Sequence, residues 1–151
     1  MSKDYSEDKL IEQTCINLFG QELDWKTINV YQGETFGPNG TLGRNSEADV
    51  ILKRLFLEAV KRLNEKLPDA AYESAYEELA VVIATKSLAE INFEKYQYLK
   101  DGIPVTYKNE KGEIVRNKKI KVFDFINPLN NNFVFIESSF RNDCFFIGSF
   151  L

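Results

Sequence analysis

Residues 87–117, SLAEINFEKYQYLKDGIPVTYKNEKGEIVRN, change the spacing of their apolar side chains at Gly102. Before this glycine the spacing is close to 3.6 residues, which predicts a helix with Ser87 as its N-cap and Gly102 at its end. The side chains expected to face inward are Leu88, Ile91, Tyr98 and Leu99. After Gly102 the apolar residues alternate, and IPVTY and EIVRN flank a turn at Gly112, which predicts a β-hairpin.

The segments after this hairpin predict a larger sheet. The pattern of KKIKVFDFI, residues 118–126, favours a third strand, and that of FVFIESSF, residues 133–140, favours a fourth. The asparagine-rich stretch NPLNNN between them is typical of a turn.

Helices are expected upstream of the hairpin. A first helix is predicted at residues 6–19, with Ser6 as N-cap and Gly20 as its end. A second is predicted in SEADVILKRLFLEAVKRLNEKLP, residues 46–68, with Ser46 and Asp49 as candidate caps, and a third begins at Pro68. A short strand is expected at Ile28, Val30 and Tyr31. This order predicts an α+β class, with N-terminal helices followed by an antiparallel or mixed sheet, in one domain over residues 1–151.

Composition limits the chemistry. The chain has 151 residues, of which 44% are hydrophobic and 28% charged, as in globular proteins. It contains no histidine and two cysteines, which excludes histidine-based nucleophilic sites, a disulfide framework and a zinc cluster within this chain. Chemistry would depend on carboxylates, lysines and a hard metal such as Mg²⁺. No apolar run reaches the length of a membrane span and the N-terminus is charged, so a cytoplasmic location is expected.

Acidic residues near the predicted strands suggest a metal site. Asp124, Glu137 and Asp143 lie in or after these strands. Metal-dependent nucleases place one carboxylate on a strand and an acid-x-Lys pair on the next, so that the acids hold Mg²⁺ and the lysine orients water. No acid-x-Lys pair follows Asp143, and the pair Asp24-Trp25-Lys26 precedes the predicted sheet. We therefore expect the site to be incomplete in this chain.

Basic and glycine-rich stretches offer weaker indications. In RNKKIK, Lys119 and Lys121 alternate on one strand face, which could follow a phosphate backbone; the alternative is a charged outer face that protects the sheet. The loop GPNGTLGR lacks the Gly-Lys-Ser/Thr ending of a phosphate-binding loop, so a mobile or partner-contacting loop is favoured. The net charge of −4 gives no overall basic field.

Several segments, taken together, resemble a known family. YSEDKLIEQ, TLGR, ADVILKRLFLEAVKRLNEKLP and the stretch from SLAEINFEKYQYLKDG to NPLNNNF occur in order over residues 5–133. In this respect the chain is similar to the N-terminal region of the R subunits of type I restriction–modification enzymes. The resemblance implies an incomplete restriction-endonuclease-like domain that ends before the nuclease Glu-x-Lys strand and the motor domains.

The resemblance also implies residues, cofactors and partners. Arg141-Asn142-Asp143 is similar to the family's Arg-x-Asp segment, which makes Asp143 a candidate catalytic and metal-binding residue, and Glu7 matches an acid that borders the metal site. If the chain contacts DNA, the alternation described above makes Lys119 and Lys121 the candidate contact residues. The parent enzyme would use Mg²⁺ and ATP and would bind DNA and the methylase and specificity subunits, whereas this chain alone is expected to be inactive and to hold no cofactor tightly.

A second hypothesis is a non-catalytic binding module. The apolar C-terminal segment CFFIG would add a strand to a partner's sheet, or to a second copy of the chain through an exposed sheet edge. No membrane association is expected under either hypothesis.

Overall fold

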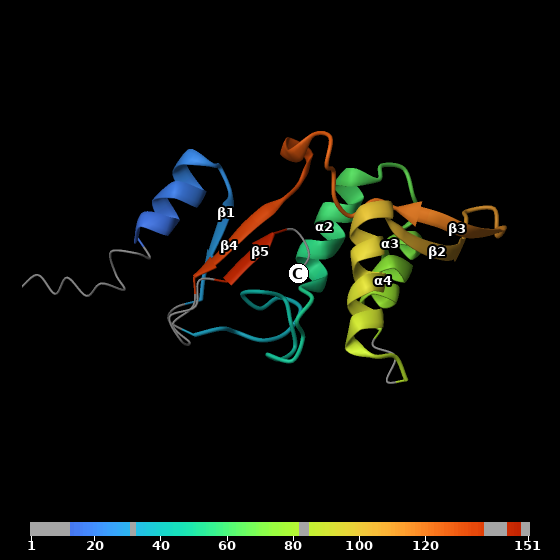
Figure 1. Cartoon of the computed structure of the whole chain (residues 1–151), viewed down its shortest axis with the longest axis horizontal. Helices are drawn as coiled ribbons and strands as arrows, with labels where there is room; N and C mark the ends of the chain where they lie inside the picture. Colours follow the sequence, from blue (N-terminus) through green and yellow to red (C-terminus); the bar gives the residue numbers. More distant parts are fainter. Residues whose placement is uncertain (1–12, 31–32, 82–84, 138–144, 149–151) are drawn as a thin grey trace, which may run out of the picture. The chain divides into compact units, whose positions relative to one another are not determined.

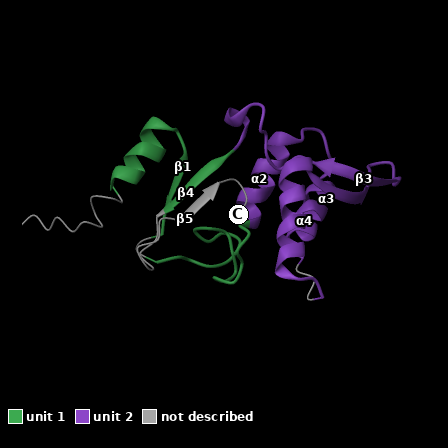
Figure 2. Cartoon of the chain, in the orientation of Figure 1, with its two compact units in different colours: residues 1–52, 132–151 green, residues 53–131 purple. Residues whose placement is uncertain are grey.

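The computed structural model describes residues 13–30, 33–81, 85–137 and 145–148 (Figure 1). The chain divides into two compact units, shown in Figure 2. Unit 1 comprises residues 1–52 and 132–151, and unit 2 comprises residues 53–131. Helices and small sheets make up both, which confirms the α+β class.

In unit 1 the first helix runs past its predicted end. An α-helical turn at residues 13–16 continues as the π-helix η1, Asn17–Glu22. Gly20 does not end the helix, because the Leu23 N–H donates to the Leu18 carbonyl and closes a wider turn at 3.0 Å. The earlier part of the predicted helix, including Ser6, lies outside the described residues.

Unit 1 contains a mixed sheet formed by both ends of the chain. Strand β1, Lys26–Asn29, pairs in parallel with β4, Phe133–Glu137. Strand β5, Phe145–Gly148, pairs antiparallel with β4, so the order is β1-β4-β5. The strand predicted at Ile28, Val30 and Tyr31 is present but begins earlier and ends at Asn29, before Val30, and Tyr31 lies outside the described residues. The strand predicted from Phe133 is confirmed as far as Glu137. The pairing of β1 with β4 joins segments far apart in the sequence.

Aromatic side chains hold the two ends of unit 1 together. Phe19 from η1 stacks on Phe135 of β4 at a centroid distance of 5.4 Å, and Trp25 lies 4.8 Å from both Phe19 and Phe133. Phe135 is 1% exposed. Such ring pairs add stability beyond their buried area, which favours this closure of the sheet.

Unit 2 contains the α-helices α2, α3 and α4. Helix α2, Lys53–Leu63, starts later than predicted, because residues before it form turns and the Asp49 carboxylate accepts from the Asn45 N–H instead of capping the helix. One face of α2 is apolar and buried, and it consists of Leu55, Phe56, Ala59 and Val60. Helix α3, Asp69–Ala80, begins directly after Pro68, as predicted.

Helix α4, Leu88–Asp101, has the start predicted for it. Ser87 Oγ accepts from the Glu90 N–H, and the Glu90 carboxylate accepts from the Ser87 N–H at 2.8 Å, which makes a capping box. Tyr98 is buried, but the prediction that Leu88 faces inward is wrong, because its side chain is 79% exposed. Leu88 is the first residue of α4.

The predicted hairpin is confirmed as β2, Ile103–Lys108, and β3, Ile114–Ile120. Its turn closes where the Gly112 N–H donates to the Asn109 carbonyl. The buried face of the hairpin packs on α3 and includes Ile103, Val105 and Ile120. Gly102 must be glycine here, because it has φ 86° and an added Cβ would lie 2.8 Å from the Ile120 carbonyl oxygen.

The predicted third strand over residues 118–126 is wrong. Lys118, Lys119 and Ile120 belong to the end of β3, and the segment that follows forms no strand. A short 3₁₀ helix, η2, Pro128–Asn130, forms the predicted turn. The reason is that two asparagine side chains bind the main chain of this segment in place of a neighbouring strand.

Candidate functional site

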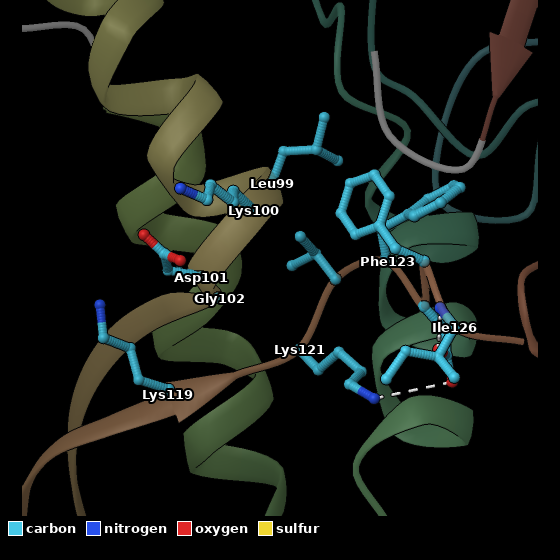
Figure 3. A pocket seen from close by; sticks show the side chains of 11 residues that line it. Leu99, Lys100, Asp101, Gly102, Lys119, Lys121, Phe123 and Ile126 are labelled. Atoms are coloured by element: carbon cyan, nitrogen blue, oxygen red, sulfur yellow. Dashed lines mark hydrogen bonds and ion pairs between the residues drawn. The ribbon is translucent and has the colours of Figure 1, made fainter.

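A pocket of about 370 Å³ lies in unit 2 where α4 ends and β3 gives way to the following segment (Figure 3). It is lined by residues 99–102, 119 and 121–126. Three lysines, two aspartates and several apolar side chains share it. The pocket therefore combines positive charge with an apolar wall.

Strand pairing sets the position of Lys119, and Lys121 comes directly after the strand. Ile120 pairs with Ile103 on the buried face of the hairpin, whereas Lys119 pairs with Pro104 on the other face. Lys121 follows one residue after β3, and both lysines are exposed and line the pocket. The predicted alternation therefore brings these two side chains to one site.

Asn64, which follows α2, holds the main chain of Lys121. Its Oδ1 accepts from the Lys121 N–H at 2.8 Å, and its Nδ2 donates to the Lys121 carbonyl at 2.7 Å. The same Nδ2 donates to the Val60 carbonyl at 2.8 Å, which ties the contact to α2. The main chain of Lys121 is thus satisfied without a partner strand.

Asn131 binds Asp124 in the same way. The Asp124 N–H donates to Asn131 Oδ1 at 2.8 Å, and Asn131 Nδ2 donates to the Asp124 carbonyl at 2.9 Å. Both residues are buried. Asn64 and Asn131 therefore fix the two ends of the segment that forms one wall of the pocket.

The Asp124 carboxylate organises the loop that follows. It accepts from Asn130 Nδ2 and from the N–H groups of Asn127 and Ile126, and it lies 3.6 Å from Lys121 Nζ. These interactions, led by the one with Asn130, lower the pKa of Asp124 to about 2. Asp124 was a candidate metal ligand in the sequence, but its oxygens are taken up by the protein.

The charges around the pocket are unequal. Lys121 faces Asp124, whereas Lys100 and Lys119 form no ion pair with a described residue. Figure 3 shows the Asp101 carboxylate on the same side of the pocket as these two lysines. Unit 2 carries 14 Lys and Arg against 12 Asp and Glu; the other 5 of 19 basic and 11 of 23 acidic residues belong to unit 1. The negative net charge therefore belongs to unit 1, and unit 2 carries a small excess of positive charge.

The apolar wall contains exposed side chains. The Phe123 and Phe125 rings lie 4.6 Å apart at an angle of 53°. Phe125 is 60% exposed and Ile126 is 94% exposed, whereas Val122, at 4%, anchors the segment in the core. Figure 3 shows Phe123 across the pocket from Lys119. The pocket thus holds aromatic side chains, one of them exposed, together with two ammonium groups that have no described ion-pair partner, which suits a ligand with an anionic part and a flat apolar part.

The structure does not test the other acidic residues that the sequence suggested as metal ligands. Glu7 and Asp143 lie outside the described residues, as does the Glu137 side chain. Within the described ranges, no three His, Cys, Asp or Glu side chains are grouped closely enough to hold a metal. Sequence reasoning missed Lys100 and Phe125 as pocket residues. The alternation in KIKVFDF was a signal for Phe125, but nothing in the sequence places Lys100 beside Lys119.

The glycine-rich loop of unit 1 is closed by its own side chains. Arg44 Nε donates to Glu34 Oε1 at 2.8 Å, and Arg44 Nη2 to Glu34 Oε2 at 2.5 Å. The Gly37 N–H donates to the Arg44 carbonyl, and the Thr35 and Thr41 hydroxyls lie 2.9 Å apart. The bidentate ion pair raises the pKa of Arg44.

Comparison with protein families assigns the chain to the proteins of restriction systems. Residues 4–139 match the family described as type I restriction enzyme R protein N terminus, and the chain belongs to that family. The expected resemblance is thereby confirmed. Neither curated proteins nor solved structures gave a match to the chain. Among the residues that the structure describes, none of the helices combines the length and the apolar character of a membrane span.

Proposed function

We propose that the chain is the N-terminal part of a type I site-specific deoxyribonuclease R subunit. The parent protein would hydrolyse DNA phosphodiesters with Mg²⁺ and translocate DNA with ATP, together with methylase and specificity subunits. The observation that supports this proposal is the family match over residues 4–139. Glu7 and Asp143 remain the proposed metal ligands, with Asp143 also catalytic.

Within this function, unit 2 would contact DNA through Lys119 and Lys121. The support is their shared pocket with Lys100, in which neither Lys100 nor Lys119 has a described carboxylate partner. Ammonium groups in this arrangement can replace the counterions of phosphates, which makes binding dependent on salt. Such contacts position a nucleic acid without reading its sequence.

The test is binding of a fluorescent duplex to the chain, measured by anisotropy over a range of salt concentrations. Lys119→Gln together with Lys121→Gln should weaken binding and reduce the slope of log K against log salt by about 1–2, because each lost phosphate contact accounts for about 0.9. The matched control is Lys108→Gln with Lys111→Gln, two exposed lysines at the opposite end of the hairpin. Equal effects of both pairs would contradict the proposed contact.

The proposed catalytic residues need the parent enzyme. Asp143→Asn should abolish Mg²⁺-dependent cleavage while leaving DNA binding and ATP hydrolysis intact. Cleavage at the normal rate by this variant would refute the assignment. We expect the 151-residue chain alone to show no cleavage.

The second candidate function is a protein-binding module. It is favoured by the position of β5 at the end of the strand order β1-β4-β5, where a partner strand could pair with it. Analytical ultracentrifugation of the chain, alone and with the methylase and specificity subunits, tests this. A chain that stays monomeric and unbound at micromolar concentration would argue against docking through β5.

A further inference from the structure

We propose that the pocket of unit 2 binds one nucleotide of an unpaired DNA strand, with the phosphate at Lys100 and Lys119 and the base against Phe125 and Ile126. The inference rests on the proposed function only in taking DNA as the ligand. It adds that the ligand is single-stranded at this site, which charge alone would not require.

Two large apolar side chains of the pocket are exposed and held in place. Phe125 and Ile126 are 60% and 94% exposed, although the chain has buried other large apolar residues of the same segment, such as Val122. Hydrogen bonds fix the main chain of this segment. The Asp124 carboxylate accepts from the Ile126 N–H at 3.0 Å, and the Asn131 side chain binds the main chain of Asp124. A fixed, exposed ring is pre-organised for a partner, since no ordering of the loop is needed on binding.

Positive charge lines the same pocket. Lys100 reaches the pocket from the end of α4, and Lys119 from the end of β3. Both are exposed and neither pairs with a described carboxylate. The nearby Asp124 carboxylate accepts three hydrogen bonds and faces Lys121, so its charge is largely compensated. One edge of the pocket is therefore available to an anion.

The exposed aromatic ring favours a single strand over a duplex as the ligand of the pocket. In a duplex both faces of each base are covered by neighbouring bases, so phosphates could bind the lysines but no base could reach Phe125. In an unpaired strand each base has a free face, and stacking on aromatic side chains next to a cationic groove is how single strands are bound. The volume of about 370 Å³ falls within the range of small-ligand sites, about 300–1,000 Å³.

Asp101 allows a test of the sign of the charge on the ligand. Its carboxylate is exposed at the pocket beside Lys100 and Lys119 (Figure 3). A phosphate bound by these lysines would be repelled by Asp101, so Asp101→Asn should strengthen binding. A positively charged ligand would respond in the opposite direction.

The experiment measures the affinity of the 151-residue chain for three labelled probes: an oligothymidylate, the same strand with abasic sites, and a duplex of equal length. Phe125→Ala should weaken binding of the oligothymidylate about 10-fold or more, without changing the affinity for the duplex or the abasic strand. Phe93→Ala is the matched control, because Phe93 is 64% exposed on α4 and lies outside the pocket. Competition by thymidine monophosphate distinguishes a site for free nucleotides from one that needs the strand.

The outcomes separate this inference from the proposed function. If Lys119→Gln weakens all three probes but Phe125→Ala weakens none, DNA contact stands and the nucleotide pocket is refuted. If no probe binds, the DNA contact itself fails. A glutamate-rich peptide that competes as well as the oligothymidylate, in a manner dependent on Phe125, would also overturn the inference, because the pocket would then be a peptide site.

Discussion

The side chain of Asn131 pairs with the main chain of Asp124 in both directions, over 2.8 Å to the amide nitrogen and 2.9 Å to the carbonyl oxygen. An asparagine amide has the same donor and acceptor as a peptide group, so it can stand in for a neighbouring strand. Asn64 does the same for Lys121. These two contacts give the segment its path and hold the pocket wall in place.

Replacing Asn131 should therefore destabilise the protein. Asn131→Ala leaves the buried N–H and carbonyl of Asp124 without partners, and each such group costs about 1–3 kcal/mol. We expect a loss of about 2–4 kcal/mol in the free energy of unfolding, measured by urea denaturation. Asn127→Ala is the matched control: it is an exposed asparagine of the same loop and should change stability by less than about 0.5 kcal/mol. Similar losses in both variants would contradict the role of Asn131.

Asn64 allows a finer test. Asn64→Asp keeps the Oδ1 acceptor for the Lys121 N–H but removes the Nδ2 donor to the carbonyls of Lys121 and Val60. The expected loss is about 1–3 kcal/mol in urea denaturation, because two carbonyls lose a donor and face a carboxylate. Glu65→Ala, at the exposed neighbouring position, should have little effect. If Asn64→Asp is as stable as the wild type, the donor half of this contact contributes nothing.

Elements whose contacts are local in the sequence could be predicted, and those that depend on distant residues could not. The hairpin and α4 were predictable because their signals are local: Ser87 and Glu90 are three residues apart, and the turn at Gly112 lies between its own strands. The end of β3 was not predictable, because alternation continues through KVFDF while the groups that bind the segment include Asn64, far upstream.

The residues of the pocket also differ in how far the sequence predicts them. The alternation in RNKKIK was enough to predict that Lys119 and Lys121 lie on one face. Lys100 joins them only because α4 and β2 are joined at Gly102, whose close approach to the Ile120 carbonyl brings the helix end against β3. Helical spacing placed Leu88 inward, but spacing alone does not show which turns of a helix are covered, and Leu88 is exposed.

Acid should weaken the protein through Asp124. Its pKa falls from an ordinary value of 3.8 to about 2 in the folded state, chiefly because of the Asn130 side chain and the Asn127 N–H. A depressed carboxyl pKa contributes stability that is fully present above the unfolded value and is lost as pH falls toward about 2. The difference in unfolding free energy between wild type and Asp124→Asn should shrink between about pH 5 and pH 2. Asp101→Asn, at an exposed acid of the same pocket, is the control, and an identical pH dependence for both variants would contradict the assignment.

The C-terminus of α3 depends on a lysine from α4. Lys95 Nζ lies 2.7 Å from the Leu79 carbonyl and 3.2 Å from those of Glu78 and Val81, and burial lowers the pKa of Lys95. A cation at a helix C-terminus stabilises its unpaired carbonyls. Lys95→Met should lower the free energy of unfolding by about 1–2 kcal/mol and speed hydrogen exchange at the end of α3. Lys100→Met, which removes an exposed charge from the same helix, should leave that exchange unchanged; equal exchange in the two variants would refute the capping role.

In unit 1, the closed glycine-rich loop should be intolerant of a side chain at Gly40. A Cβ there would lie 2.0 Å from the Thr35 carbonyl oxygen, a main-chain atom that is also bound by the Thr41 N–H at 3.0 Å. The main chain must move to relieve this contact, so Gly40→Ala should cost about 1–3 kcal/mol or more in thermal or urea unfolding. The main-chain movement should also break the ion pair between Glu34 and Arg44. Glu34→Gln removes the same ion pair without adding a steric contact, so it measures the contribution of the ion pair alone. Asn39→Ala, at the exposed neighbouring position, should be neutral. A Gly40→Ala protein as stable as Asn39→Ala would show that the loop is not closed in the way described.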